Sequence, residues 1–302
     1  MTMATDPNRV ERGEIVVPGS ISNLGPAFDS LSVAVRLYLR VRIVDVIDES
    51  PDRLEFEFVD CPIPEDNRIA RAFTLARERI GARTPGLRLE VRSEIPIRAG
   101  LGSSGAAAVA GLRLYESLTA PRPVTDWLRL ASEIEGHPDN AAAALNGGLS
   151  LSCQLDDGRV TARGMPWPAA IHFVVATPDT PLETARARAV LPASVPLKDA
   201  IFNLQRALML LRALQAGDAG DLREAIRDRW HQPYRAALVP GLQEALAIDH
   251  PAVLGVCLSG AGPSVVALAT ADSAPEAGHV LEGVYRRLGL TCTIRTLKAH
   301  QS

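Results

Sequence analysis

The segment from Pro96 to Ala108 combines glycines and serines immediately before an alanine-rich stretch. Its three glycines allow positive backbone φ angles and let other groups approach the main chain closely. Ser103 or Ser104 is suited to cap the N-terminus of the helix that should follow. The unpaired N–H groups and the positive dipole end of such a helix bind phosphate. The segment therefore predicts a phosphate-binding loop, although an ordinary strand-to-helix turn can have a similar composition.

This loop is not of the Walker A type. Neither the pattern GxxxxGK[ST] nor any Gly-Lys pair occurs in the sequence. Lys198 and Lys298 are the only two lysines, and neither lies in a glycine-rich loop. We therefore exclude a P-loop NTPase and expect groups other than a loop lysine to neutralise the charge of a phosphate.

The segment Glu133–Asn140 places three carboxylates, one imidazole and one amide within eight residues. A glycine and a proline interrupt it, so several of these polar groups can be directed at one point. Carboxylate oxygens are ligands that Mg²⁺ prefers. Structural roles stay open for the same residues: Ser132 and Glu135 could form a capping box, and Asp139 could cap the next helix.

Two further segments contain glycine and polar side chains. Leu258–Ser264 lies between two apolar stretches. On local evidence, a functional glycine loop and a plain hairpin turn fit it equally well. Pro18–Asp29 carries Asn23 and Asp29 within small, turn-prone residues, and on its own it predicts a loop.

Hydrophobic periodicity predicts the elements that must position these segments. A loose polar arm is expected at residues 1–13, followed by strands within 14–59, a helix over 66–80, a strand over 87–96, and helices after the glycine loop and over 125–135. The second half predicts strands over 147–153, 171–178 and 291–297, a strand-turn-strand unit over 253–270, and helices over 197–214, 221–229, 234–247 and 273–287.

The order of these elements indicates an α+β fold in two lobes. Strands come in groups interleaved with helix pairs, without the regular βαβ alternation of a doubly wound sheet. The stretch 156–170 contains many turn-forming residues and predicts a connection between the lobes. We therefore expect one domain at 1–160 and a second at 161–302.

Composition sets outer limits on function. The chain has 302 residues with 47% hydrophobic and 22% charged residues, and its net charge is −3. These values indicate a globular protein and argue against a nucleic-acid or membrane partner. The four cysteines show no zinc-ligand spacing, and the first residues lack the apolar core of a signal peptide. We expect a cytoplasmic protein.

Taken together and in this order, the segments resemble the GHMP kinases and, within them, the homoserine kinase family. Pro96–Ala108 is similar to the family's PxxxGLGSSAA phosphate loop, Pro18–Asp29 to its PxSxANLGxGFD motif, and Ser259–Ser264 to its C-terminal glycine motif. EGHPDN, Thr184–Pro192 and His231–Pro240 narrow the resemblance to homoserine kinases. The resemblance covers nearly the whole chain.

The resemblance implies an ATP-dependent phosphorylation of the side-chain hydroxyl of L-homoserine. The product would be O-phospho-L-homoserine, an intermediate on the way to threonine, and Mg²⁺ would be required. The implied fold has an N-terminal lobe with a left-handed βαβ unit of ribosomal S5 type and a ferredoxin-like C-terminal lobe. A homodimer fits the resemblance, although the sequence shows no interface.

The resemblance also implies roles for individual residues. Asn67 would contact adenine, and the phosphates of ATP would be held by Pro96, Ile97, Arg98, Ala99, Gly100, Leu101, Gly102, Ser103, Ser104, Gly105 and Ala106. Mg²⁺ would be bound by Ser104 and either Glu135 or Glu133, with Glu135 preferred because a glycine follows the ligand in related sequences. The amino acid would be surrounded by Asn23, Asp29, His137, Asp139, Thr184, Arg188 and Arg235.

These residue types suit the proposed chemistry. Arginines can bind the carboxylate of an amino acid, and Asp29 can bind its ammonium group. Asp139 would orient the hydroxyl or accept its proton, and Arg98 would add positive charge near the transferred phosphoryl group. One departure from the family pattern, Gly105 in place of an alanine, is expected to loosen the start of the helix.

Two other functions remain open. The first is a GHMP kinase for another small alcohol, such as mevalonate, which has no ammonium group for Asp29 to bind. The second is a non-catalytic GHMP protein that binds nucleotide and metabolite as a regulator. Loss of the Mg²⁺ carboxylate or of Asp139 would indicate such a regulator, and both are present.

Overall fold

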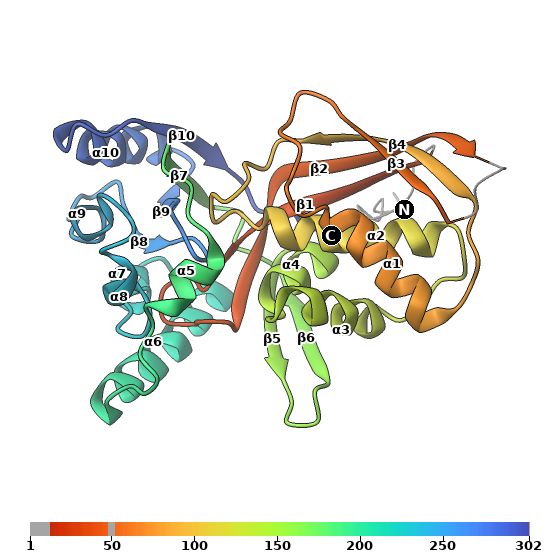
Figure 1. Cartoon of the computed structure of the whole chain (residues 1–302). Coiled ribbons are helices and arrows are strands. Elements are labelled where there is room, and N and C mark those ends of the chain that lie inside the picture. Colours follow the sequence, from red (N-terminus) through yellow and green to blue (C-terminus); the bar gives the residue numbers. More distant parts are fainter. Residues whose placement is uncertain (1–12, 48–51, 302) are drawn as a thin grey trace, which may run out of the picture.

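The computed structural model of the protein describes residues 13–47 and 52–301. The predicted N-terminal arm lies outside these residues except for its last one. Figure 1 shows two lobes, one built mainly from the first half of the chain and one from the second. Each lobe contains its own sheet, which confirms the predicted α+β class.

The N-terminal lobe is a six-stranded sheet in the order β3-β4-β2-β5-β6, with β1 paired to β2. Four helices, α1 to α4, lie between its strands in the sequence, and α2, α3 and α4 pack against the sheet. The strands are β1 Glu14–Ser22, β2 Leu31–Ile47, β3 Leu54–Phe58, β4 Gly86–Ser93, β5 Leu149–Gln154 and β6 Val160–Met165; the helices are α1 Arg68–Ile80, α2 Ser103–Ser117, α3 Val124–Glu135 and α4 Asp139–Asn146.

The C-terminal lobe is a four-stranded antiparallel sheet in the order β10-β7-β9-β8. Helix α10 packs against β7, β9 and β10, and shorter helices surround β8. The strands are β7 Ile171–Pro178, β8 Gly255–Leu258, β9 Val265–Thr270 and β10 Cys292–Leu297; the helices are α5 Thr184–Ala189, α6 Leu197–Ala216, α7 Leu222–Ala225, α8 Gln232–Arg235, α9 Leu242–Leu246 and α10 Ala274–Arg287.

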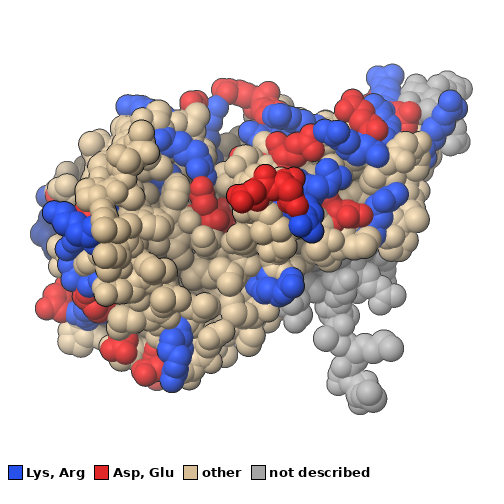
Figure 2. Space-filling view, turned by 90° about the horizontal axis from the view of Figure 1, so that it is seen from below, with Lys and Arg blue, Asp and Glu red and all other residues tan. Residues whose placement is uncertain are grey.

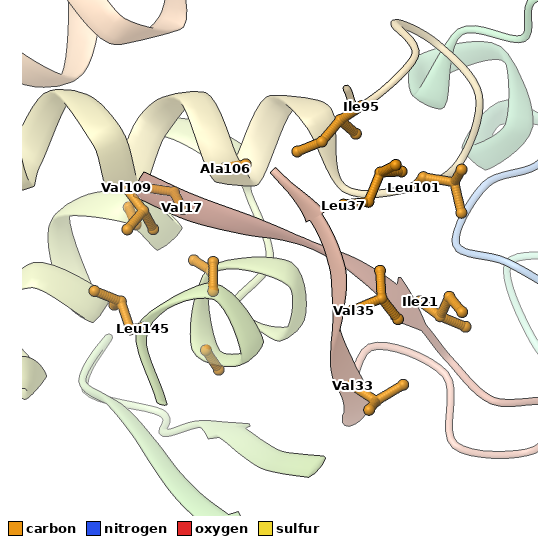
Figure 3. Close-up of a cluster of buried hydrophobic side chains, with 14 of the residues drawn as sticks. Val17, Ile21, Val33, Val35, Leu37, Ile95, Leu101, Ala106, Val109 and Leu145 are labelled. Carbon is orange, nitrogen blue, oxygen red and sulfur yellow. The ribbon is translucent and has the colours of Figure 1, made fainter. Parts of the chain in front are cut away.

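A hydrophobic core joins β1 and β2 to α2 and α4. In Figure 3, Val17 on β1 lies beside Val109 on α2, with Leu145 of α4 below them, and Ile21 on β1 lies beside Val35 on β2. All five side chains belong to one buried cluster. Burial of such side chains contributes about 1.5–3 kcal/mol each to folding. The packing holds the N-terminal ends of α2 and α4 over the same sheet, where the predicted site residues lie.

Two parts of the sequence prediction are wrong. The expected turn-rich connection at 156–170 contains β6, which pairs with β5 as a hairpin. The domain boundary at residue 160 stays a prediction, and the change from one sheet to the other falls between Met165 and Ile171.

The second error concerns the helices after α6. The predicted helix over 221–229 is helical only over Leu222–Ala225, and the one over 234–247 is divided into α8 and α9. Pro240 and Gly241 separate α8 from α9, and Gly241 has a φ of +79°. Asp228 accepts three backbone N–H groups from the next residues, so its side chain replaces helical hydrogen bonds.

The two lobes are joined at the glycine loop. Ser259 Oγ donates to the Gly100 carbonyl at 2.6 Å, and the Ser264 N–H donates to the Ala99 carbonyl at 3.2 Å. A Cβ at Gly100 would lie 2.4 Å from the Ser259 carbonyl oxygen, and Gly100 has a φ of +78°. Only glycine fits this contact, which ties the N-terminal loop to the C-terminal glycine turn.

Helix α6 presents an apolar stripe to solvent. Leu197, Ile201, Leu204 and Leu208 follow one another at intervals of four, three and four residues, and Leu197 is 76% exposed. The predicted self-association stays a prediction.

Among the helices of the described residues, none combines the length and apolar character needed to cross a membrane. On the face in Figure 2, acidic and basic side chains lie interspersed.

Candidate active site

A cavity of about 540 Å³ is lined by residues from both lobes. Most of the predicted site residues line it, including the polar side chains assigned to the amino acid and the loop assigned to phosphate. Four do not: Pro96, Leu101, Ala106 and Glu133. Leu101 and Ala106 are instead part of the hydrophobic core. The fold therefore collects segments that are far apart in the sequence around one space.

The N-terminus of α2 opens into this cavity without a side-chain cap. The capping residue is Gly102, with a φ of +74°, so the predicted capping by Ser103 or Ser104 is wrong. The N–H groups of residues 103–105 have no acceptor among the described residues. A Cβ at Gly102 would lie 2.1 Å from Ser20 Oγ. This arrangement fits phosphate oxygens, which accept hydrogen bonds from helix N-termini.

Gly105 allows α2 to approach α4 closely. It is buried, and a Cβ there would lie 2.9 Å from Cβ of Asn140. Asn140 Oδ1 accepts a hydrogen bond of 2.8 Å from Ser20 Oγ. Gly105 has a low helix propensity, but its close approach to Asn140 packs α2 tightly against α4. These surroundings do not indicate the expected loosening at the start of the helix.

Ser104 and Glu135 meet beside the predicted phosphate loop. Ser104 Oγ donates to Glu135 Oε1 at 2.7 Å, and Arg68 donates to the same oxygen at 2.7 Å. The Glu135 side chain is 5% exposed. Its Oε2 has no hydrogen-bond donor among the described residues, which leaves a carboxylate oxygen next to a hydroxyl. Two hard oxygens in this position fit Mg²⁺.

Glu133 lies apart from this pair. Its carboxylate forms an ion pair with Arg79 and is 40% exposed. The two candidate carboxylates, two residues apart on α3, therefore point in different directions, and the geometry favours Glu135 over Glu133. The capping-box alternative does not occur, because Ser132 Oγ donates to the Leu128 carbonyl within α3.

The region around Asn67 has an apolar wall. Asn67 caps α1 by accepting the Ala70 N–H at 3.2 Å, and it lines the cavity. The neighbouring lining includes Phe58, Ile63, Ile69 and Val91. A flat, largely apolar group such as a nucleobase suits this part of the cavity.

Arg98 lies at the cavity margin and is already paired. Its Nη2 lies 2.6 Å from Glu65 and 3.5 Å from Glu183, and the side chain is 41% exposed. Arg68 is the guanidinium that contacts the Ser104–Glu135 pair. Sequence reasoning missed Arg68, and its place directly after Asn67 was the available signal.

Asp139 and His137 form a buried pair. Asp139 is the first residue of α4, after a Pro138 cap, so the N-cap alternative does not hold. His137 Nδ1 lies 2.6 Å from Asp139 Oδ1. Burial acts against both charges, but the hydrogen bond and opposite charge outweigh it: the pKa of His137 is raised and that of Asp139 is lowered. Between pH 3.8 and pH 6.5 the pair is therefore an imidazolium with a carboxylate.

Asp29 is bound by Arg188 from the other lobe. The Arg188 Nη2–H and Nη1–H groups donate to Oδ1 and Oδ2 at 2.7 and 3.0 Å. Burial acts to lower the pKa of Arg188, but the hydrogen bond and charge of Asp29 raise it overall. Asn23, with a φ of +72°, holds the loop by accepting the Asp29 N–H and donating to the Gly260 carbonyl. Thr184 begins α5 at the cavity wall.

Arg235 is a buried guanidinium without a carboxylate partner among the described residues. It is 1% exposed and yet lines the cavity. Burial and the neighbouring charge of Arg188 lower its pKa to about 10. Phe28 lies between the two arginines, with its ring centre 5.4 Å from Cζ of Arg188 and 5.2 Å from Cζ of Arg235. A buried cation of this kind is stabilised by an anionic ligand.

Three of these side chains have the composition of a metal site. One potential ligand atom from each of Asp29, His137 and Asp139 lies within 4.8 Å of the others. Arg188 binds both oxygens of Asp29, and His137 Nδ1 faces Asp139. The cluster is therefore better described as a network of ion pairs.

Sequence reasoning also missed Phe28 and the buried residues before Arg235. Phe28 directly precedes a predicted site residue, which was a usable signal. Asp228 and His231 lie three residues apart in the sequence, and both side chains are fully buried. Only the fold shows that His231 contacts Arg235, with its Nδ1 3.2 Å from Nη1.

Comparison with known proteins gives a consistent result. Residues 67–148 match the family of GHMP kinases N terminal domains, and residues 210–287 match GHMP kinases C terminal domains. The chain is 41% identical to the homoserine kinase of Solibacter usitatus over 83% of each chain. It is 39% identical to that of Gloeobacter violaceus over 91% of this chain and 94% of the relative.

Solved structures show the same fold. The homoserine kinase of Cytophaga hutchinsonii superposes with a TM-score of 0.82 at 24% identity, over 100% of this chain and 97% of that one. A putative homoserine kinase from Listeria monocytogenes superposes with a TM-score of 0.73 at 28% identity, over 96% and 97% of the two chains.

Proposed function

The chain belongs to the GHMP kinase family and, within it, to the homoserine kinases, and from this premise we propose that it phosphorylates L-homoserine with ATP. The hydroxyl oxygen of the side chain would attack the γ-phosphorus of ATP, releasing ADP and O-phospho-L-homoserine. The product would then serve threonine synthesis.

The observation that carries the substrate assignment is the buried, unpaired guanidinium of Arg235. Its Nη2 has no acceptor among the described residues, and the side chain lines the cavity beside the Asp29–Arg188 pair. An α-amino acid supplies a carboxylate for the arginines and an ammonium group for Asp29. Its side-chain hydroxyl would then extend toward the phosphate loop.

The residues around the loop support nucleotide binding. The free N–H groups at the start of α2 would bind phosphate oxygens, and the apolar wall near Asn67 would hold adenine. Ser104 and Glu135 would bind Mg²⁺ through hard oxygens. When bound, Mg²⁺ supplies positive charge against the phosphate oxygens, and Arg68, which contacts Glu135, would add to it.

The His137–Asp139 pair would act on the acceptor hydroxyl. Asp139 is kept ionised by His137, so one of its oxygens can accept a hydrogen bond from the hydroxyl and fix its orientation. We propose that Asp139 mainly orients the acceptor hydroxyl and, as a secondary role, accepts its proton. Phosphoryl transfer depends mainly on alignment and charge neutralisation.

The alternatives are less well supported. Mevalonate has a carboxylate but no ammonium group, and it would leave Asp29 without a ligand partner. A non-catalytic regulator would not need Glu135 beside Ser104 or Asp139 beside His137. Both arrangements are present in the structure.

The test is ATP turnover by the purified protein with Mg²⁺. L-homoserine, L-threonine, L-serine, mevalonate and 4-hydroxybutyrate, which is homoserine without its amino group, would be compared as acceptors. We expect kcat/KM to be highest for L-homoserine and at least tenfold lower for 4-hydroxybutyrate, since one charged hydrogen bond contributes about 1.5–3 kcal/mol. Equal use of these two acceptors would refute the role of Asp29, and tight ATP binding without turnover would favour the regulator.

A further inference from the structure

A buried turn precedes Arg235 and is built around one carboxylate. Asp228 is fully buried, and its Oδ2 accepts the N–H groups of His231 at 3.0 Å and Gln232 at 2.7 Å. Its Oδ1 accepts the Trp230 N–H and the Asn203 side-chain amide, both at 2.7 Å. These four hydrogen bonds fix the backbone from which α8 begins.

His231 is fixed on both sides of its ring. Its Nε2 lies 2.9 Å from the Gly25 carbonyl oxygen, and its Nδ1 lies 3.2 Å from Nη1 of Arg235. A carbonyl can only accept and a guanidinium can only donate a hydrogen bond. The ring must therefore be neutral, with its proton on Nε2. Phe28 stacks on it with ring centres 5.2 Å apart.

The hydrogen bonds of Arg235 are divided between protein and cavity. Its Nε–H donates to the Ala187 carbonyl at 3.0 Å. The two Nη1–H groups donate to the Gly260 carbonyl at 2.9 Å and to His231 Nδ1. The protein thus holds three N–H groups with neutral acceptors, and Nη2 keeps two N–H groups without an acceptor among the described residues. The positive charge of Arg235 remains available to a ligand.

We propose that His231 is a positioning residue for Arg235, and that its neutral, Nε2-protonated ring directs the Nη2 edge of the guanidinium toward the substrate carboxylate. Asp228 supports this role by fixing the main chain at His231. A neutral acceptor is required here, because a carboxylate in the place of the imidazole would satisfy the charge of Arg235 and compete with the ligand. The inference rests on the proposed function, since it takes the ligand to be an amino acid.

Two substitutions at His231 separate its two hydrogen bonds. The amide of His231→Asn reaches the position of Nδ1, so its oxygen can still accept from Arg235. The amide of His231→Gln reaches the position of Nε2, so its nitrogen can still donate to Gly25 while the contact to Arg235 is lost. His279→Gln, on an exposed histidine of α10, is the matched control.

We expect His231→Gln to raise both KM and the calorimetric Kd for L-homoserine about tenfold, as for one hydrogen bond to a charged group. The KM for ATP and kcat should change less than about twofold, and His231→Asn should stay several-fold closer to wild type. In an Arg235→Ala background, His231→Gln should have no further effect on KM. Equal KM values for the two variants, or an undiminished effect without Arg235, would overturn the proposal.

A measurement on the wild-type protein reads the protonation of the ring directly. In the ¹⁵N spectrum of histidine-labelled protein, one imidazole should be neutral with a protonated Nε2 and an unprotonated Nδ1, and its signals should be absent from His231→Asn. A protonated Nδ1 at this residue would contradict the assignment. Failure of the proposed function is seen separately, because wild-type protein would then neither bind nor phosphorylate L-homoserine.

Discussion

Arg188 closes over Asp29 with two hydrogen bonds, of 2.7 and 3.0 Å, that link the two lobes across the cavity. The two charges are the ones that an amino acid would need, a carboxylate for its ammonium group and a guanidinium for its carboxylate. A zwitterion can replace the pair without leaving either charge unmatched. A ligand with only one of the two charges would leave one partner without compensation.

Asp29→Asn should therefore affect the amino acid and not the nucleotide. We expect the KM for L-homoserine to rise about 10- to 100-fold, corresponding to loss of a charged hydrogen bond of about 1.5–3 kcal/mol, with the KM for ATP within twofold of wild type. Asp272→Asn, on an exposed loop, is the control. Steady-state kinetics with each substrate varied in turn would check this. A parallel rise in both KM values would contradict the assignment of Asp29 to the acceptor.

Asp139 and Arg235 should act on different kinetic parameters. Asp139→Asn should lower kcat by about 10²-fold, the lower end of the range for a group acting on the transferred proton or its oxygen. Arg235→Ala should mainly raise the KM for L-homoserine, because its role is in binding. Equal losses in kcat and KM for both variants would count against these separate roles.

Glu135 and Glu133 offer a matched pair for the metal. Glu135→Gln keeps the shape of the side chain but removes its charge, and we expect the Mg²⁺ concentration for half-maximal activity to rise at least about tenfold. Glu133→Gln, which lies outside the cavity beside Arg79, should leave that concentration unchanged. Activity titrated against free Mg²⁺ would show which glutamate binds the metal. A larger effect from Glu133→Gln would assign the metal to Glu133 instead.

The His137–Asp139 pair should make stability depend on pH. The pKa of His137 is raised from its ordinary 6.5, so its contribution is present below pH 6.5 and is lost as pH rises through the folded value. The pKa of Asp139 is lowered from 3.8, so its contribution is present above pH 3.8 and is lost as pH falls through the folded value. The pair therefore contributes most to the free energy of unfolding between pH 3.8 and pH 6.5.

His137→Gln should remove this dependence. Urea unfolding of the variant and of wild type across pH 3–9 should show the largest difference in free energy of unfolding between about pH 4 and pH 6.5, and a shrinking difference above it. The exposed His279→Gln serves as the reference for a histidine lost elsewhere. A difference that stays constant with pH would show that the pair is not charged in the folded protein.

Local sequence patterns determined most of the elements and the glycine loop that leads into α2. Alternation at Leu54–Phe58 and the helical spacing over Arg68–Ile80 are short-range properties, so they can be predicted without the fold. The helices after α6 were less predictable. There the side chain of Asp228 takes over backbone hydrogen bonds, and Pro240 with Gly241 stops a helix that composition alone would continue.

The sequence by itself also determined which residue types were available: a glycine loop without lysine, carboxylates near a histidine, and arginines in two later segments. The tertiary structure decided how they are used. It directs Glu135 into the cavity and Glu133 away from it, and it places His231 against Arg235. Three neutral acceptors hold the rest of the Arg235 guanidinium, and Nη2 has no acceptor among the described residues. Distance, direction and burial decide these roles. They arise from packing between residues far apart in the chain, which residue types and their spacing do not specify.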